Sequence, residues 1–177
     1  MMQLNKSLET IPFNPAFFPQ QLLLLSVDDN MMPMGYWTAI SKEPFRFLIC
    51  MGVGNYSLTL LKKSREAALH FMEWDQREKV VAAGYYSGRD INKSTKLGFE
   101  LLPAEKLQRT KLIAGAITTY ETIVFQELPN ISREFCLFLM DVVATHGPKS
   151  TGLRKPIYYM GNDHFSTIGE TWHYNKK

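Results

Sequence analysis

Two long segments in the second half of the chain constrain the fold more than any other feature. Residues 117–128 and 135–146 are both rich in β-branched and aromatic side chains, which favour extended strands. Between them lies Pro129-Asn130-Ile131-Ser132, a short run with turn-forming residues. Two strands with so short a connection pair antiparallel, so the sequence predicts a long β-hairpin.

The rest of the chain adds shorter strands and few helices. Apolar runs that end at turn-forming residues predict strands over 21–27, 34–40, 45–53, 67–72 and 157–160. One helix is predicted over 56–64, and another over about 76–86 with Asp75 as its N-cap and a buried side made of Val80, Val81, Ala83 and Tyr85. Strands dominate without strict βαβ alternation. We therefore expect a mainly β fold with short helices, a small barrel in a single domain over 1–177.

The composition excludes several classes of protein. Lys and Arg exceed Asp and Glu by 20 − 17 = 3, hydrophobic residues make up 45%, and no Lys/Arg-rich run occurs, which argues against disorder and against nucleic acid as a partner. No apolar run approaches the ~20 residues that cross a bilayer, so no membrane association is predicted. The polar start 1–10 and the prolines after it do not resemble an export signal, so we expect a cytoplasmic protein.

Motifs of several enzyme classes are absent or incomplete. Residues 84–88 place the serine one position too late for the G-x-S-x-G elbow of hydrolases. The four histidines lie far apart and Cys50 and Cys136 sit in apolar runs, so neither a metal site nor a catalytic residue is predicted. The stretch 52–57, with two glycines between a predicted strand and a predicted helix, is a weak dinucleotide fingerprint but favours an anion-binding turn.

The most informative segment is Ser87-Gly88-Arg89-Asp90, with Lys93 three residues later. It resembles the S-G-R-D-x-x-K motif of the flavin reductase-like proteins, the FMN-binding split-barrel group that includes flavoredoxins and ferric reductases. Further stretches follow the family's order and spacing, namely 35–41 with Pro44 after it, 55–57, and 156–161 with Phe165 and Gly169. The resemblance covers about Gln21 to Gly169, and it implies an FMN-binding split β-barrel.

The resemblance also implies which residues hold FMN. Trp37, Thr38 and Ala39 would lie along the isoalloxazine ring, unless Trp37 is a core or interface aromatic. The phosphate turn would be formed by Asn55, Tyr56 and Ser57, with a charge-assisted contact from Lys93. Arg89 would assist there, or pair with Asp90 or Glu100 instead. Phe165 would approach the flavin from the C-terminal region, or pack in the core.

The function implied by the resemblance is that of a flavin reductase or flavoredoxin-like oxidoreductase. Electrons would pass from NADH or NADPH through FMN to an acceptor that the sequence does not identify. The cofactor carries the chemistry, so no catalytic acid or nucleophile is required. The resemblance also implies an obligate homodimer with FMN near the subunit interface. The apolar segments 45–53 and 135–144 would suit a large buried dimer surface.

Two departures from the family pattern keep other functions open. Asn55 stands where a basic residue is common, and 31–34 is Met-Met-Pro-Met where polar residues are common. The methionines would be soft contacts for a ring or filling for the barrel. One alternative is a non-catalytic or sensory flavin-binding module. Another is a structural barrel without a cofactor.

Overall fold

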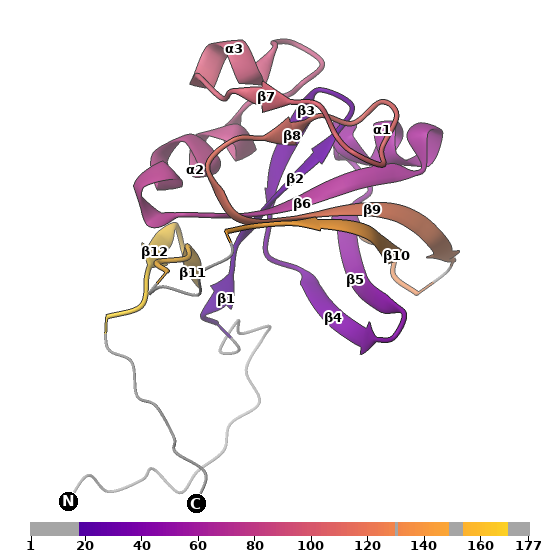
Figure 1. The fold of residues 1–177 in the computed structure, drawn as a ribbon. Helices are drawn as coiled ribbons and strands as arrows, with labels where there is room; N and C mark the ends of the chain where they lie inside the picture. The colour runs from indigo at the N-terminus through magenta and orange to yellow at the C-terminus, as the bar shows by residue number, and fades with distance from the viewer. Residues whose placement is uncertain (1–17, 130, 149–153, 170–177) are drawn as a thin grey trace, which may run out of the picture.

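A seven-stranded antiparallel sheet organises the part of the chain that the computed structural model describes, residues 18–129, 131–148 and 154–169. The strand order is β3-β2-β6-β9-β10-β5-β4 (Figure 1). These strands are β2 (Leu23–Val27), β3 (Asn30–Met34), β4 (Trp37–Lys42), β5 (Phe45–Gly52), β6 (Glu66–Met72), β9 (Ala116–Leu128) and β10 (Phe135–His146). The expected mainly β fold with short helices is confirmed.

Smaller elements flank the main sheet. A small sheet joins β1 (Gln20–Gln21), β11 (Tyr158–Gly161) and β12 (His164–Ser166), and another pairs β7 (Leu101–Leu102) with β8 (Leu112–Ile113). The helical elements are α1 (Tyr56–Ser64), the short turn η1 (Trp74–Gln76), α2 (Arg77–Tyr85) and α3 (Lys93–Leu97). None of these helices is long and apolar enough to cross a membrane.

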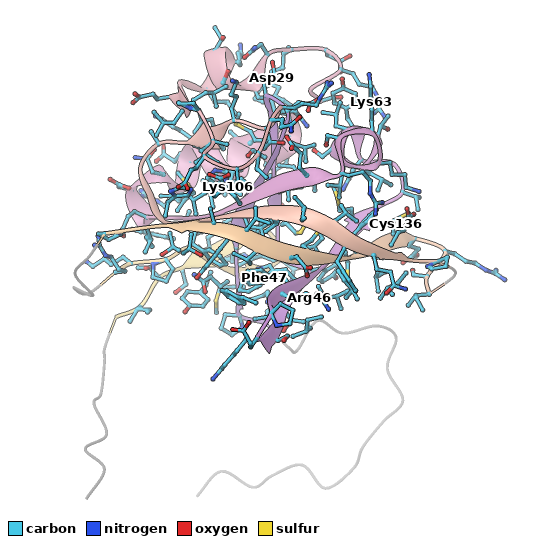
Figure 2. All side chains as sticks on the ribbon, turned by 45° about the vertical axis from the view of Figure 1, so that its right-hand side comes forward. Asp29, Arg46, Phe47, Lys63, Lys106 and Cys136 are labelled. Atoms are coloured by element: carbon cyan, nitrogen blue, oxygen red, sulfur yellow. The ribbon has the colours of Figure 1, made fainter. Side chains whose placement is uncertain are left out.

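The predicted hairpin is the centre of the sheet. β9 and β10 pair from Thr119 opposite His146 to Leu128 opposite Leu137, with two register shifts, and β10 then pairs with β5. Residue 130 of the connection lies outside the described residues. Phe47 and Arg46 are neighbours on β5 (Figure 2). They point to opposite faces, as the pleat requires: Phe47 is buried in the core, and Arg46 pairs with Asp141 on the outer face.

The sheet curls around an apolar core on its inner side. Its two edge strands, β3 and β4, are consecutive in the chain and are joined by Gly35 and Tyr36 alone. Trp37 on β4 reaches across to Phe71 on β6, with the ring centres 5.0 Å apart. Leu58 and Leu61 of α1 pack into the same core. On the other side of the sheet lies a second apolar cluster, the outer core, in which Val80 and Ala83 of α2 pack against Leu22, Leu24 and Met31.

Several local predictions were wrong at their boundaries. The expected strand over 34–40 is two strands, because Gly35 and Tyr36 carry the chain from one sheet edge to the other. Asp75 lies inside η1 and does not cap α2, whose N-cap is Gln76. Tyr85 is 70% exposed, since it lies at the end of α2 beyond the sheet. The polar segment 87–98 contains α3, which begins where the Asn92 side chain accepts a hydrogen bond from Thr95 N–H at 2.9 Å.

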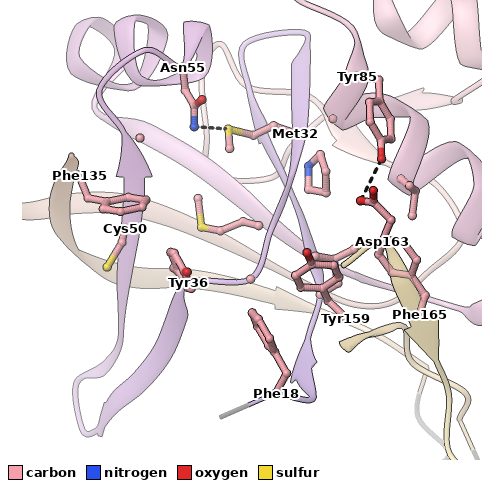
Figure 3. A pocket seen from close by; sticks show the side chains of 17 residues that line it. Phe18, Met32, Tyr36, Cys50, Asn55, Tyr85, Phe135, Tyr159, Asp163 and Phe165 are labelled. Atoms are coloured by element: carbon pink, nitrogen blue, oxygen red, sulfur yellow. Dashed lines mark hydrogen bonds between the residues drawn. The ribbon is translucent and has the colours of Figure 1, made fainter. Parts of the chain in front are cut away.

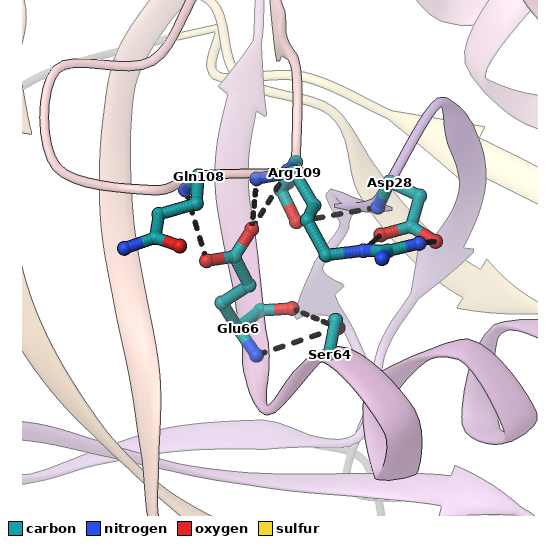
Figure 4. A network of polar contacts seen from close by, with 6 residues as sticks. Asp28, Ser64, Glu66, Gln108 and Arg109 are labelled. Atoms are coloured by element: carbon teal, nitrogen blue, oxygen red, sulfur yellow. Dashed lines mark hydrogen bonds and ion pairs between the residues drawn. The ribbon is translucent and has the colours of Figure 1, made fainter.

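Two buried carboxylates, those of Glu66 and Glu121, hold the loop 103–111 between β7 and β8. Glu66 accepts hydrogen bonds of 2.7–3.0 Å from three consecutive backbone N–H groups, those of Gln108, Arg109 and Thr110 (Figure 4). Glu121 does the same for Glu105, Lys106 and Leu107 at 2.6–3.0 Å. Burial raises the pKa of both carboxyls, but the hydrogen bonds outweigh it and the net shift is downward. Both groups are therefore held as carboxylates.

His70 on β6 is fully buried and neutral. Its Nδ1–H donates to the Leu24 carbonyl oxygen at 3.0 Å, and its Nε2 accepts from the N–H of Ile113 at 2.9 Å. Protonation of Nε2 would break the second bond and bury a charge. Burial is the largest cause that lowers the pKa of His70, from 6.5 to about 4.

We expect the folded chain to lose stability as pH falls from 6.5 toward 4. The unfolded chain takes up a proton at His70 in this range and the folded chain does not, so a contribution of about 3 kcal/mol that is present above pH 6.5 is lost. Urea unfolding across this range measures it. A His70→Gln variant, which has no titratable ring, should lose that part of the slope. An equal slope in the variant would assign the pH dependence to other groups.

Candidate functional site

A groove with a polar and an apolar half runs between β3, α1, α2 and the β11–β12 hairpin. The polar half measures about 480 Å³ and the apolar half about 470 Å³. Both halves are lined by the same five residues where they meet, namely Met32, Pro33, Asn55, Gly84 and Tyr85. The groove is therefore one continuous site that suits a long ligand with a polar end and an apolar end.

The N-terminus of α1 forms one wall of the polar half. Gly54, Asn55, Tyr56 and Ser57 line it, and no side chain caps the helix or places a carboxylate in its first turn. The first N–H groups of a helix and its positive dipole end attract anions. Ser57 is buried, and its hydroxyl oxygen accepts a hydrogen bond from Asn30 Nδ2 at 2.8 Å, which leaves its own O–H to donate.

Lys93 is the buried cation of the polar half. It is 5% exposed, and its ammonium donates to the carbonyl oxygens of Met31 (2.7 Å) and Ala83 (2.8 Å). One of its three N–H bonds is left for another acceptor. Within the described residues, Lys93 forms no ion pair, and burial lowers its pKa. A buried ammonium without a counter-charge is costly, so this position favours an anion.

Arg89 adds a second positive charge at the rim. Its guanidinium lies over the ring of Tyr56, 5.1 Å from the ring centre, and among the described residues it pairs with neither Asp90 nor Glu100. The described residues that line the polar half include these two cations and no Asp or Glu. Its electrostatics therefore fit a phosphate group.

Asn30 and Gly88 form a tight corner of the polar half. Gly88 approaches Asn30 so closely that an added Cβ would lie 2.2 Å from Asn30 Oδ1, which explains a glycine here. Asn30 Oδ1 is the one buried side-chain polar atom of the described residues without a hydrogen-bond partner. An acceptor in this state needs a donor, such as a ligand hydroxyl. The corner therefore places one unpaired acceptor at the edge of the polar half.

The apolar half is built from aromatic rings that come from distant parts of the chain (Figure 3). The rings are those of Phe18, Tyr36, Tyr85, Phe135, Tyr159 and Phe165. Met32 and Met34 also line it, whereas Met31 packs in the outer core. Cys50 lies on the wall as a half-buried free thiol whose pKa is raised by burial. Such a cavity suits a flat aromatic ligand.

The structure brings together six of the nine site residues predicted from sequence. Asn55 lies where the two halves meet, with Nδ2 3.8 Å from Met32 Sδ. Tyr56, Ser57, Arg89 and Lys93 line the polar half and Phe165 lines the apolar half. The polar half could be predicted from sequence because the residues that line it belong to two short motifs.

Trp37, Thr38 and Ala39 do not line the groove in this chain. Trp37 packs in the core against Phe47 and Phe71, and its Nε1–H donates to the Gln21 carbonyl oxygen at 2.8 Å. Thr38 and Ala39 are exposed on the edge strand β4. A contact between these three residues and a flavin ring stays a prediction. The described residues contain no cluster of three or more metal-binding side chains.

Comparison with known proteins identifies the fold. A family model described as flavin reductase like domain matches residues 16–169. No curated protein matches the chain. An FMN-binding protein from Thermus thermophilus, solved with bound 1-cyclohex-2-enone, superposes with a TM-score of 0.81 at 20% identity, over 97% of this chain and 99% of that one.

Two further solved structures share the fold. Flavoredoxin from Methanosarcina acetivorans has a TM-score of 0.80 at 18% identity, over 94% of this chain and 95% of that one. The NADH:FAD oxidoreductase SgcE6 from Streptomyces globisporus has a TM-score of 0.75 at 18% identity, over 86% and 88% of the two chains. Likeness at such identities establishes a common architecture, while ligands have to be argued from this chain's own residues.

Proposed function

This chain belongs to the flavin reductase-like domain family, and we propose that it binds FMN in the groove and works as a flavin-dependent oxidoreductase. Its reductant is NADH or NADPH, and electrons leave to an acceptor that is a separate molecule. The observation that carries the proposal is the polar half, whose described lining residues include two cations and no carboxylate. A phosphate supplies the counter-charge that Lys93 lacks.

Different residues of the groove bind different parts of FMN. The first turn of α1, Ser57, Lys93 and Arg89 hold the phosphate, and the corner of Asn30 and Gly88 takes the hydroxyl-bearing chain. The apolar half takes the flat ring and excludes water from it. When bound, FMN supplies the hydride and electron chemistry, so the protein has to orient the ring and control access to it.

An anaerobic spectrum separates an enzyme from a binding module. FMN-loaded chain, freed of unbound flavin, is mixed with NADH or NADPH while the flavin absorbance is followed. We expect the visible absorbance band of oxidised flavin to disappear on reduction and to return when air is admitted. Retained colour that neither nucleotide bleaches, although dithionite does, would contradict the reductase assignment and favour a non-catalytic flavin module.

A homodimer completes this proposal, because the described residues leave one face of the sheet uncovered. The helices contact β2 and β3, and none of them covers the outer face of β5 and β10 (Figure 1). On that face Leu48 pairs with Leu139, and Phe125 is 53% exposed under the guanidinium of Arg46. Cys50 and Phe135 lie on the same two strands and line the apolar half. A second copy bound to this face would therefore form part of the wall of the apolar half, where the flavin ring is proposed to bind.

We expect light scattering during gel filtration to give twice the mass of the chain. A Leu139→Lys variant should shift the equilibrium to monomer, because it places a charge in the centre of the apolar face. Lys42→Glu, an exposed change on the edge strand, serves as the control. A wild-type chain that elutes as a monomer at micromolar concentration would contradict the dimer.

A further inference from the structure

The apolar half opens between α2 and the β11–β12 hairpin. A second hollow, of about 500 Å³, lies outside it and shares Val81, Tyr85 and Phe165 with it. Across this opening the hydroxyl of Tyr85 donates to Asp163 Oδ1 at 3.2 Å (Figure 3). A molecule that reaches the ring site from the second hollow passes this pair of side chains.

Asp163 determines the charge at the opening. Among the described residues that line the apolar half it is the one charged residue, and the others are apolar, aromatic or neutral polar groups. It forms no ion pair within the described part of the chain. In the second hollow Arg77 and Glu78 lie 3.6 Å apart and offset each other. The opening therefore presents a single uncompensated negative charge beside an aromatic wall.

We propose that Asp163 selects the second ring that meets the flavin, admitting neutral or positively charged aromatic rings and disfavouring aromatic anions. This inference rests on the proposed function, because the second ring has to share the apolar half with FMN. The aromatic wall binds a flat ring of any charge, and a carboxylate beside that wall distinguishes rings by their charge alone. The preferred redox partner accordingly presents an uncharged or cationic ring, such as a nicotinamide or a quinone.

The exposure of Asp163 determines how strongly it can discriminate between charged rings. Asp163 is exposed, so water screens it, and its effect on a charged ring is about threefold to tenfold in the dissociation constant. The same reasoning predicts that added salt weakens the selection, because mobile ions screen exposed charges within about 10 Å.

Asp163→Asn removes the charge and preserves the local structure. Asp163 has a left-handed backbone with φ 59°, which Asn adopts as readily as Asp. The amide oxygen of Asn can still accept the hydrogen bond from Tyr85. Tyr85→Phe is the complementary variant, since it removes that hydrogen bond and keeps the charge. Asp75→Asn, which removes an exposed carboxylate outside both hollows, is the control for net charge.

Three pyridine probes of similar size measure the selection without turnover. 1-Methylnicotinamide is a cation, nicotinamide is neutral and nicotinate is an anion. Their dissociation constants are obtained from the change in fluorescence of oxidised, bound FMN. In the wild type we expect the anion to bind about threefold to tenfold more weakly than the neutral probe. Asp163→Asn should bring the anion close to the neutral probe, weaken the cation and leave the neutral probe unchanged. Tyr85→Phe and Asp75→Asn should keep the wild-type ratios.

Failure of this inference differs from failure of the proposed function. A chain that retains no FMN shows this in its spectrum before any probe is added, and it overturns both. A yellow protein whose anion-to-cation ratio is the same in the wild type and in Asp163→Asn overturns the selection alone. A Tyr85→Phe variant that changes the ratio as much as Asp163→Asn would assign the effect to the hydrogen bond and overturn the role of the charge.

Discussion

Replacing Lys93 by Met should weaken FMN binding by about 10-fold to 100-fold, the value of a charge-assisted hydrogen bond in a buried site. Met keeps much of the length of the side chain and removes its ammonium. The phosphate then loses the one buried cation of the polar half, and Arg89 at the exposed rim cannot replace it. Titration of the FMN-free protein with FMN, followed by quenching of flavin fluorescence, gives the affinity.

A matched variant separates the site from general charge. Lys63→Met removes an exposed ammonium on α1, outside the lining of the groove, and should change the affinity less than about twofold. Lys93→Met also leaves the carbonyl oxygens of Met31 and Ala83 without their donor, so urea unfolding of both FMN-free variants is measured alongside. Equal affinities in Lys93→Met and Lys63→Met, both folded, would contradict the phosphate assignment.

Glu66→Gln should lower the free energy of unfolding by about 3–5 kcal/mol, the largest stability effect we expect from a single isosteric change. The carboxylate accepts three backbone N–H groups with its two oxygens. Gln replaces one of these oxygens by an NH₂ group, which faces a donor with a donor, and it removes the charge that strengthens the other bonds. Thermal unfolding should show a fall in Tm of roughly 6–20 °C for a chain of this length.

The loop that Glu66 holds also contacts the β2–β3 turn. Arg109, in the loop that Glu66 holds, pairs with Asp28 at 3.1 Å, and Asp28 lies two residues before Asn30 (Figure 4).

Glu127→Gln is the control for Glu66→Gln, since it removes a carboxylate that makes only a surface ion pair with Lys62. That variant should lose less than about 1 kcal/mol. Comparable losses in the two variants would show that the buried hydrogen bonds of Glu66 contribute little.

The parts of the fold that the sequence predicted have strong local signals. The β9–β10 hairpin was found because both strands are long and β-branched, and α1 because its apolar residues repeat at helical spacing. α3 was missed because its five residues are too few to show a period. The division of 34–40 was missed because a crossing between sheet edges leaves no local signal beyond Gly35.

The two halves of the groove also differed in how well the sequence predicted them. The polar half depends on neighbours in sequence, Asn55–Ser57 and Arg89–Lys93, and a motif contains both their identity and their spacing. The apolar half joins Phe18, Tyr36, Phe135 and Tyr159, which come together only when the sheet curls and the C-terminal hairpin folds back onto β1. No spacing in the chain marks such a set. Trp37 shows the opposite case, since a motif residue has its ring in the core.

The binding of FMN itself is the central claim, and retention of added flavin tests it most directly. Purified chain is incubated with excess FMN, passed through a desalting column, and its protein and flavin absorbance are compared. We predict about one FMN per chain, retained by the wild type and by Lys63→Met and largely lost by Lys93→Met. Folded wild-type protein that elutes without flavin, and whose fluorescence titration shows no saturable binding, would contradict the account.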